Sequence, residues 1–169
     1  GTREGFAFVI QNNPAPTLGA GGRGLGYEGV DNSVAIEFDV RRNFEHVDLA
    51  PGHISVHTHG IYANLASHNA SLGASIAGLT ELSDGNAHVA TIHYRPGRLQ
   101  VFLDSTNAPR LEVRCDLAKL MNLDNGQAWI GFTADGAVAN GRVSSWDFAP
   151  ASGPAFGFSL PPNNATAVF

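Results

Sequence analysis

The sequence predicts an all-β fold, an antiparallel β-sandwich, on three observations. Apolar residues alternate with polar ones at a period of two, the spacing of a strand with one buried face. Twenty glycines and nine prolines among 169 residues fit many strands joined by tight turns. No long stretch has the 3.6-residue period of an amphipathic helix, and only residues 117–123 are expected to form a short helical turn.

Length and charge restrict the classes of protein that the chain can represent. A chain of 169 residues fits one domain with a substantial core. The formal net charge of −5 argues against non-specific nucleic-acid binding, which needs a basic face. No apolar run is long enough to span a bilayer and no signal peptide is visible. Because residue 1 stands almost directly before a strand, we expect a processed or partial chain.

The densest group of metal-binding side chains lies on the strand expected over residues 34–39 and just beyond it. The group consists of Glu37, Asp39, Asn43, Asp48 and His53. Glu37 and Asp39 share one strand face, roughly 7 Å apart by the strand rise. Oxygens of Asp39, Asn43 and Asp48, with a loop carbonyl, suit Ca²⁺. The three carboxylates with His53 suit Mn²⁺ or another transition metal. The alternative is a solvated strand face without a metal.

This spacing resembles the calcium and manganese loop of the legume-type (L-type) lectins, and other segments resemble the same family in the same order. These are Gly-Phe-Ala-Phe-Val-Ile-Gln at 5–11, the glycine-rich loop at 21–27, Asp-Gly at 84–85, Trp-Ile-Gly-Phe-Thr-Ala at 129–134 and Ser-Ser-Trp-Asp-Phe at 144–148. The resemblance implies a concanavalin A-like jelly roll. It also implies strands over 5–11, 88–94, 99–103, 111–117, 129–134 and 144–148. The single cysteine, Cys115, is in phase with the 111–117 strand and is expected to be buried.

The resemblance also implies a carbohydrate site without catalysis. The saccharide contacts that it implies are Glu4, Gly22, Asn43, Asp135 and Gly136. Glu4 replaces the aspartate of the family, so the geometry of that contact is open. Arg41 stands where the family commonly has an aromatic residue; its backbone carbonyl can still bind calcium, but its side chain offers no apolar platform for a sugar.

A run of histidines allows a different metal site. His53, Ser55, His57 and His59 lie on one face of the strand expected over 54–57, so a three-histidine zinc site is conceivable. The lectin resemblance uses His53 alone. We therefore expect His57 and His59 to be surface residues.

The ends of the domain and its setting give further expectations. We expect a lectin-like domain over 1–148 and a proline-rich tail or arm over 149–169. The family usually has several strands before the one at 5–11, so a partner chain or second copy is expected to complete the sandwich. Sequons at Asn69 and Asn164 favour a secreted or cell-surface glycoprotein.

Three functional classes follow. The first is a metal-dependent carbohydrate-binding domain for extracellular glycans. The second is a structural or assembly module of a larger extracellular polymer that keeps the fold with weak or no sugar binding. The third is a glycoside hydrolase, and such enzymes on a similar sandwich often show the pattern Glu-x-Asp-x-x-Glu. Arg41 and Arg42 stand where the second glutamate of this pattern would be needed, so the acid/base partner is missing. We therefore reject the enzyme.

Overall fold

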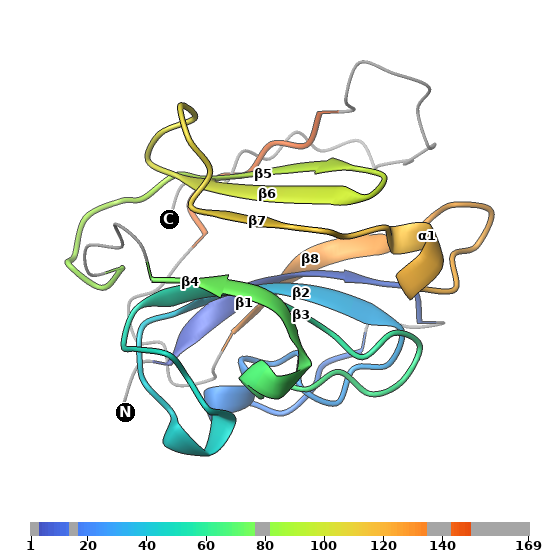
Figure 1. The fold of residues 1–169 in the computed structure, drawn as a ribbon, viewed down its shortest axis with the longest axis horizontal. Helices are drawn as coiled ribbons and strands as arrows, with labels where there is room; N and C mark the ends of the chain where they lie inside the picture. The colour runs from blue at the N-terminus through green and yellow to red at the C-terminus, as the bar shows by residue number, and fades with distance from the viewer. Residues whose placement is uncertain (1–3, 14–16, 77–81, 135–142, 150–169) are drawn as a thin grey trace.

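The computed structural model describes residues 4–13, 17–76, 82–134 and 143–149, and these residues form two antiparallel sheets in two layers (Figure 1). The larger sheet has the order β4-β3-β2-β1-β8, with β4 at Ser71–Ser75, β3 at His53–Thr58, β2 at Ser33–Asp39, β1 at Gly5–Gln11 and β8 at Trp129–Ala134. The smaller sheet has the order β5-β6-β7, at Ala90–Arg95, Arg98–Leu103 and Leu111–Val113. The predicted all-β sandwich is confirmed.

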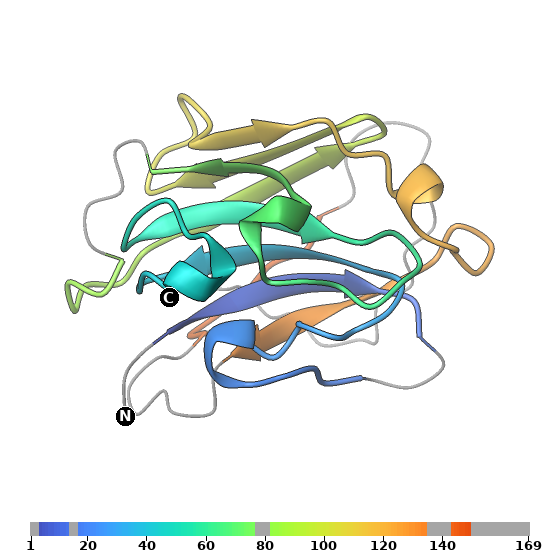
Figure 2. The same cartoon turned by 60° about the horizontal axis from the view of Figure 1, so that its bottom comes forward.

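In the described part of the chain, four short helical turns connect the strands. They are η1 at Gly22–Gly24, η2 at Phe44–His46, η3 at His68–Ala70 and α1 at Leu117–Leu120. Figure 2 shows η1, η2 and η3, in blue, cyan and green, lying across the outer face of the larger sheet. The predicted helical turn is α1, and the hydroxyl of Tyr94 in β5 accepts the backbone N–H of Leu117 at its start (3.0 Å).

The core fills the space between the two sheets. Alternate residues of β2 and β3 face it, namely Val34, Ile36, Phe38, Ile54 and Val56, each at most 1% exposed. They meet Leu99, Val101, Leu103, Leu111 and Val113 of the smaller sheet. Cys115 is buried in the same cluster, as its phase predicted.

Close approach of the two sheets requires a glycine in β4. A Cβ added to Gly73 would lie 2.8 Å from Cγ1 of Val113 in β7, nearer than side-chain carbons pack. No strand was expected at β4, because its Ser-Leu-Gly-Ala-Ser segment consists mostly of small and polar residues. The strand forms through its pairing with β3.

Two of the expected strands differ in the structure. The strand expected over 111–117 ends at Val113, since the chain turns there and enters α1 at Leu117. The strand expected over 144–148 is wrong: the described residues 143–149 contain no strand. Trp146 instead packs its ring edge against Phe132 of β8, with centroids 5.9 Å apart, so this segment contacts the sheet through a side chain.

Candidate functional site

The pairing of β2 with β3 gathers the polar side chains on the outer face of the larger sheet. In this antiparallel register Asp39 pairs with His53 and Glu37 with Ser55. Because side chains alternate between faces, the polar residues lie opposite the apolar core positions. Loops cover them, so Glu37 and Asp39 are each only 2% exposed. The result is a buried, charged centre beneath the loops of the outer face.

Glu37 is the hub of this centre. Its carboxylate accepts hydrogen bonds from the Tyr27 hydroxyl and the Ser55 hydroxyl, both at 2.7 Å. The same carboxylate faces Nε2 of His53 at 3.1 Å and Nε2 of His57 at 3.3 Å. Burial alone would raise the pKa of Glu37, but the contacts with His53, His57 and Ser55 hold it well below its ordinary value. Glu37 is therefore an anion at neutral pH.

Both histidines present the atom that a metal would bind. Nδ1 of His53 lies 3.0 Å from the carbonyl of Ala50, and Nδ1 of His57 lies 3.0 Å from the carbonyl of Leu65. A carbonyl only accepts, so each Nδ1 donates its proton, and a neutral ring then turns the lone pair of Nε2 toward Glu37. A lone pair that faces a carboxylate oxygen is an unfavourable contact, which a bound cation, either a metal ion or a proton, would remove; the Ser55 hydroxyl also lies 2.9 Å from Nε2 of His57. A backbone carbonyl on the other ring nitrogen is also typical of metal-binding histidines.

Without a metal ion, a proton would take that place. Burial would lower the pKa of His53, but its hydrogen bond to Glu37 and the charges of Glu37 and Asp39 raise it. Burial raises the pKa of Asp39 to about 8, although the N–H of Arg41 opposes this shift. Asp39 and His53 thus bind protons more tightly than isolated side chains do, whereas Glu37 binds its proton less tightly. A divalent cation would compensate the same buried negative charge.

The connection from β2 to β3 curls back over the centre, as its spacing predicted. Oδ1 of Asp39 accepts the backbone N–H of Arg41 at 2.6 Å, and Oδ2 of Asp48 accepts that of Asn43 at 2.5 Å. Val47 ends η2 with a positive φ of 63°, which turns the chain toward Asp48. Asp48 and Asn43 are buried in consequence.

The predicted metal ligands therefore converge. One ligand atom from each of Glu37, Asp39 and His53 lies within 4.8 Å of the others, and the same holds for Asp48, His53 and His68. Carboxylate oxygens with imidazole nitrogens form a donor set that fits a divalent metal ion. These donors thus fit a transition metal ion, and the calcium set of Asp39, Asn43, Asp48 and the Arg41 carbonyl stays a prediction.

Two histidines differ from the expectations or were missed. The expectation that His57 lies on the surface is wrong, because His57 is fully buried against Glu37. His53, Ser55 and His57 occupy alternate positions of β3, so they share one face, and this spacing could have predicted the burial of His57. His59 lies beyond the end of β3 and is exposed, as expected. His68 enters from η3, distant in sequence, and no local pattern indicated it.

The predicted saccharide contacts are partly assembled. Glu4 accepts the side-chain amide of Asn43 at 2.9 Å and pairs with the Arg41 guanidinium at 2.9 Å. An ion pair between Arg23 and Glu45 joins the loop of Gly22 to the metal-loop turn η2. Asp135, Gly136 and the sequon at Asn164 lie outside the described residues, as does the tail from residue 150. Asn69 lies in η3 and is exposed.

The sandwich, with its acid and histidine centre on the outer face, matches a known family over most of its length. The model of the legume lectin domain family matches residues 1–157, so the chain belongs to that family. The family is non-catalytic, and membership implies carbohydrate binding. A search of curated proteins finds no match to the chain. Within the described residues, no helix is long and apolar enough to cross a membrane.

Proposed function

We propose that this chain is a metal-dependent lectin domain that binds glycans outside the cell or at its surface. Calcium is held by Asp39, Asn43, Asp48 and the carbonyl of Arg41. A transition metal, Mn²⁺ or a related ion, is held by Glu37, Asp39, Asp48 and His53. The saccharide is bound by Glu4, Gly22, Asn43, Asp135 and Gly136, within a domain spanning 1–148.

The observation that carries this proposal is the position of Asn43 between the two sites. Its backbone N–H donates to Asp48, a predicted metal ligand, and its side-chain amide donates to Glu4, a predicted saccharide ligand. Because the amide nitrogen is used by Glu4, the amide oxygen is the atom left to bind calcium. A metal ion that orders the loop would therefore also fix the saccharide contacts.

A saccharide that binds Glu4 would compete with groups that already contact its carboxylate. The Arg41 guanidinium donates to one oxygen and the Asn43 side-chain amide donates to the other. The guanidinium side of the Arg41 pair is 44% exposed. The Glu4 side chain is only 10% exposed, so a ligand that displaces Arg41 must itself hydrogen-bond this buried carboxylate.

The same ion pair is the observation that favours the second candidate, a structural module with weak sugar binding. Arg41 occupies the carboxylate that a saccharide would use and supplies no ring for it to pack against. Replacing Arg41 with tyrosine separates the two candidates. A lectin weakened by Arg41 gains glycan affinity in Arg41→Tyr, whereas a structural module gains none.

Glycan-array binding of the purified protein, with calcium and a transition metal and again with a chelator, tests the leading proposal. We expect binding to a defined glycan that the chelator abolishes. Asn43→Ala should lose this binding, and Asn107→Ala, an exposed asparagine away from the centre, should keep it. Metal-loaded protein that binds no glycan on the array would overturn the proposal and leave the structural module.

We also propose that a partner chain or second copy covers part of the sandwich. The edge strand β8 begins at Trp129, which is 62% exposed, and Leu18 nearby is 73% exposed. These two residues line a cavity of about 300 Å³ with Val9 and Phe132. Light scattering after gel filtration should show an oligomer. A stable monomer with Trp129 exposed would contradict this proposal.

A further inference from the structure

His68 is a buried side chain without a partner that suits it. The side chain is only 7% exposed, and neither ring nitrogen has a hydrogen-bond partner among the described residues. Its nearest charged atom is Oδ1 of Asp48, 3.3 Å from Nδ1. A buried polar group left without a hydrogen bond costs about 1–3 kcal/mol. A fold that places an imidazole in this position therefore points to a ligand that is bound there.

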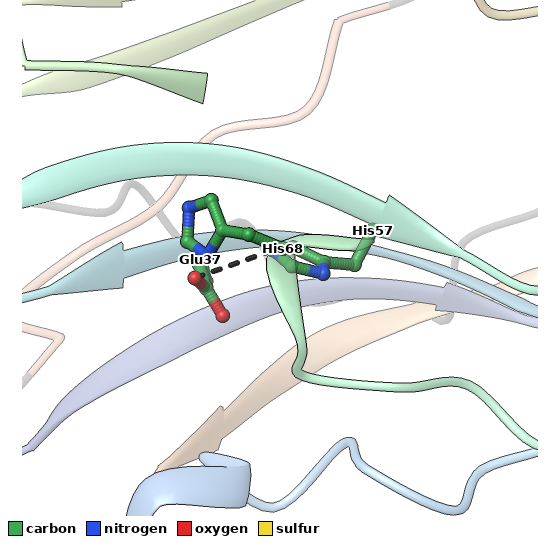
Figure 3. A group of neighbouring side chains, drawn as sticks. All are labelled: Glu37, His57 and His68. Atoms are coloured by element: carbon green, nitrogen blue, oxygen red, sulfur yellow. Dashed lines mark ion pairs between the residues drawn. The ribbon is translucent and has the colours of Figure 1, made fainter. Parts of the chain in front are cut away.

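The ring of His68 lies beside those of two other histidines. Its centroid is 4.7 Å from that of His53 and 5.2 Å from that of His57, edge to face in both pairs. Figure 3 shows Glu37 and His57 meeting on neighbouring strands while His68 reaches them from the segment before β4. One ligand atom from each of Glu37, His57 and His68 lies within 4.8 Å of the others. Three imidazoles thus surround the anionic Glu37.

The spacing of the donor atoms suits direct coordination. Two ligands at about 2.0–2.1 Å from a tetrahedral zinc ion are about 3.3–3.4 Å apart. The distance is 3.3 Å from His57 Nε2 to Glu37 Oε1 and also 3.3 Å from His68 Nδ1 to Asp48 Oδ1. From His53 Nε2 to Glu37 Oε1 it is 3.1 Å. Each of these pairs thus has nearly the separation of two ligands on one small ion.

We propose that His68 is a direct ligand of the transition metal and that His68, His53 and His57 make this centre select Zn²⁺ over Mn²⁺. The inference rests on the metal centre of the proposed function and adds a ligand and a preferred ion to it. A centre with one imidazole and three carboxylates suits Mn²⁺. Added imidazoles shift the preference along the series toward Zn²⁺, because nitrogen donors favour the later ions.

X-ray absorption at the zinc edge tests the ligand assignment on the unmodified protein. The chain is stripped with a chelator and reloaded with calcium and one equivalent of Zn²⁺. We expect scattering from at least two imidazoles, since His53 and His68 both coordinate. A spectrum with a single imidazole would overturn the proposal even if a His68 variant failed to fold.

Competition between the two ions tests selectivity. With calcium in excess and equimolar Zn²⁺ and Mn²⁺, the amount of zinc bound to the wild-type chain should be about ten times the amount of manganese or more. His68→Gln should lose about tenfold or more in zinc affinity and a smaller factor in manganese affinity, whereas the exposed His59→Gln should match the wild type.

Equal retention of the two ions, or an unchanged zinc affinity in His68→Gln, would overturn this inference and leave the proposed lectin function in place. A chain that binds no transition metal would remove both this inference and the transition-metal part of that function. Calcium-dependent glycan binding, measured on the array, reports on the lectin function separately.

Discussion

Replacing Asp39 with asparagine should change the stability of the metal-free protein in a pH-dependent direction. Burial raises the pKa of Asp39 to about 8, from an ordinary value of 3.8. Between these two values the folded chain holds a proton that the unfolded chain has released. Folding stability from this group is therefore highest at acid pH and falls as the pH rises toward 8.

The size of the effect follows from the same pKa. A tenfold change in proton affinity is worth about 1.4 kcal/mol, so between pH 5 and pH 8 Asp39 removes at most about 4 kcal/mol from the free energy of unfolding. Asparagine carries no charge at any pH and is nearly the same size. From pH 5 to pH 8, the free energy of unfolding of Asp39→Asn should therefore rise relative to that of the wild type by up to this amount.

Urea unfolding of chelated protein at pH 5 and pH 8 measures this difference. Asp31→Asn is the control, because Asp31 is exposed and its carboxylate lies outside the centre. Subtracting the wild-type curve from that of the variant cancels the titrating groups that are distant from Asp39; the contribution of His53, whose pKa the charge of Asp39 raises, changes together with that of Asp39. A difference that is the same at the two pH values would refute the reasoning that Asp39 is a buried, uncompensated acid.

In the presence of calcium, the wild type and not Asp39→Asn should be the protein that gains stability. A ligand that binds only the folded chain stabilises it by about 2.7 kcal/mol at a free concentration of 100 times its Kd. The wild type should gain this from calcium, whereas Asp39→Asn, which lacks the anionic oxygen shared by the two ions, should gain little. Equal stabilisation of the two proteins by calcium would show that Asp39 is not a ligand.

Other predictions concern parts of the fold away from the metal. The pKa of His88 should lie above its ordinary value, because its hydrogen bond to Asp104 raises it against the opposing effect of partial burial; an NMR titration of Asp104→Asn should show a lower pKa, and an unchanged one would contradict the assignment. Gly5→Ala should destabilise the fold by about 2–4 kcal/mol in urea, because a Cβ at its φ of +144° would lie 2.3 Å from the Phe38 carbonyl oxygen. Gly21→Ala, with nothing within 4 Å of its Cβ, should be nearly neutral, and equal losses for the two variants would contradict the steric account.

The strands with one apolar face were predictable, and so was the core between them. Val34, Ile36 and Phe38 alternate with polar residues, and this period alone places them in the core. The strand β4 was not predictable in this way, since Gly73 is required by its approach to Val113 and not by any local preference. The 144–148 segment carries aromatic residues typical of a strand, but Trp146 uses its ring to contact β8.

The residues of the candidate site also differ in whether local sequence patterns could predict them. Glu37, Asp39 and His53 belong to two paired strands and a short connection, so their spacing in the sequence carries their proximity in space. His57 shares the same face and could have been placed by phase, but its polarity suggested solvent. His68 arrives through η3 and becomes a neighbour only through the path of the chain between β3 and β4. Long-range placement of this kind leaves no local pattern.

The measurement that tests the central claim most directly is the metal content of the purified chain by mass spectrometry after dialysis against calcium and a mixture of transition metals. The metal centre proposed here predicts one calcium and one transition ion per wild-type chain, and a loss of both in Asp39→Ala, because Asp39 serves the two ions. Asp39→Ala that keeps its full metal content, or a folded wild type that holds neither ion, would contradict the account.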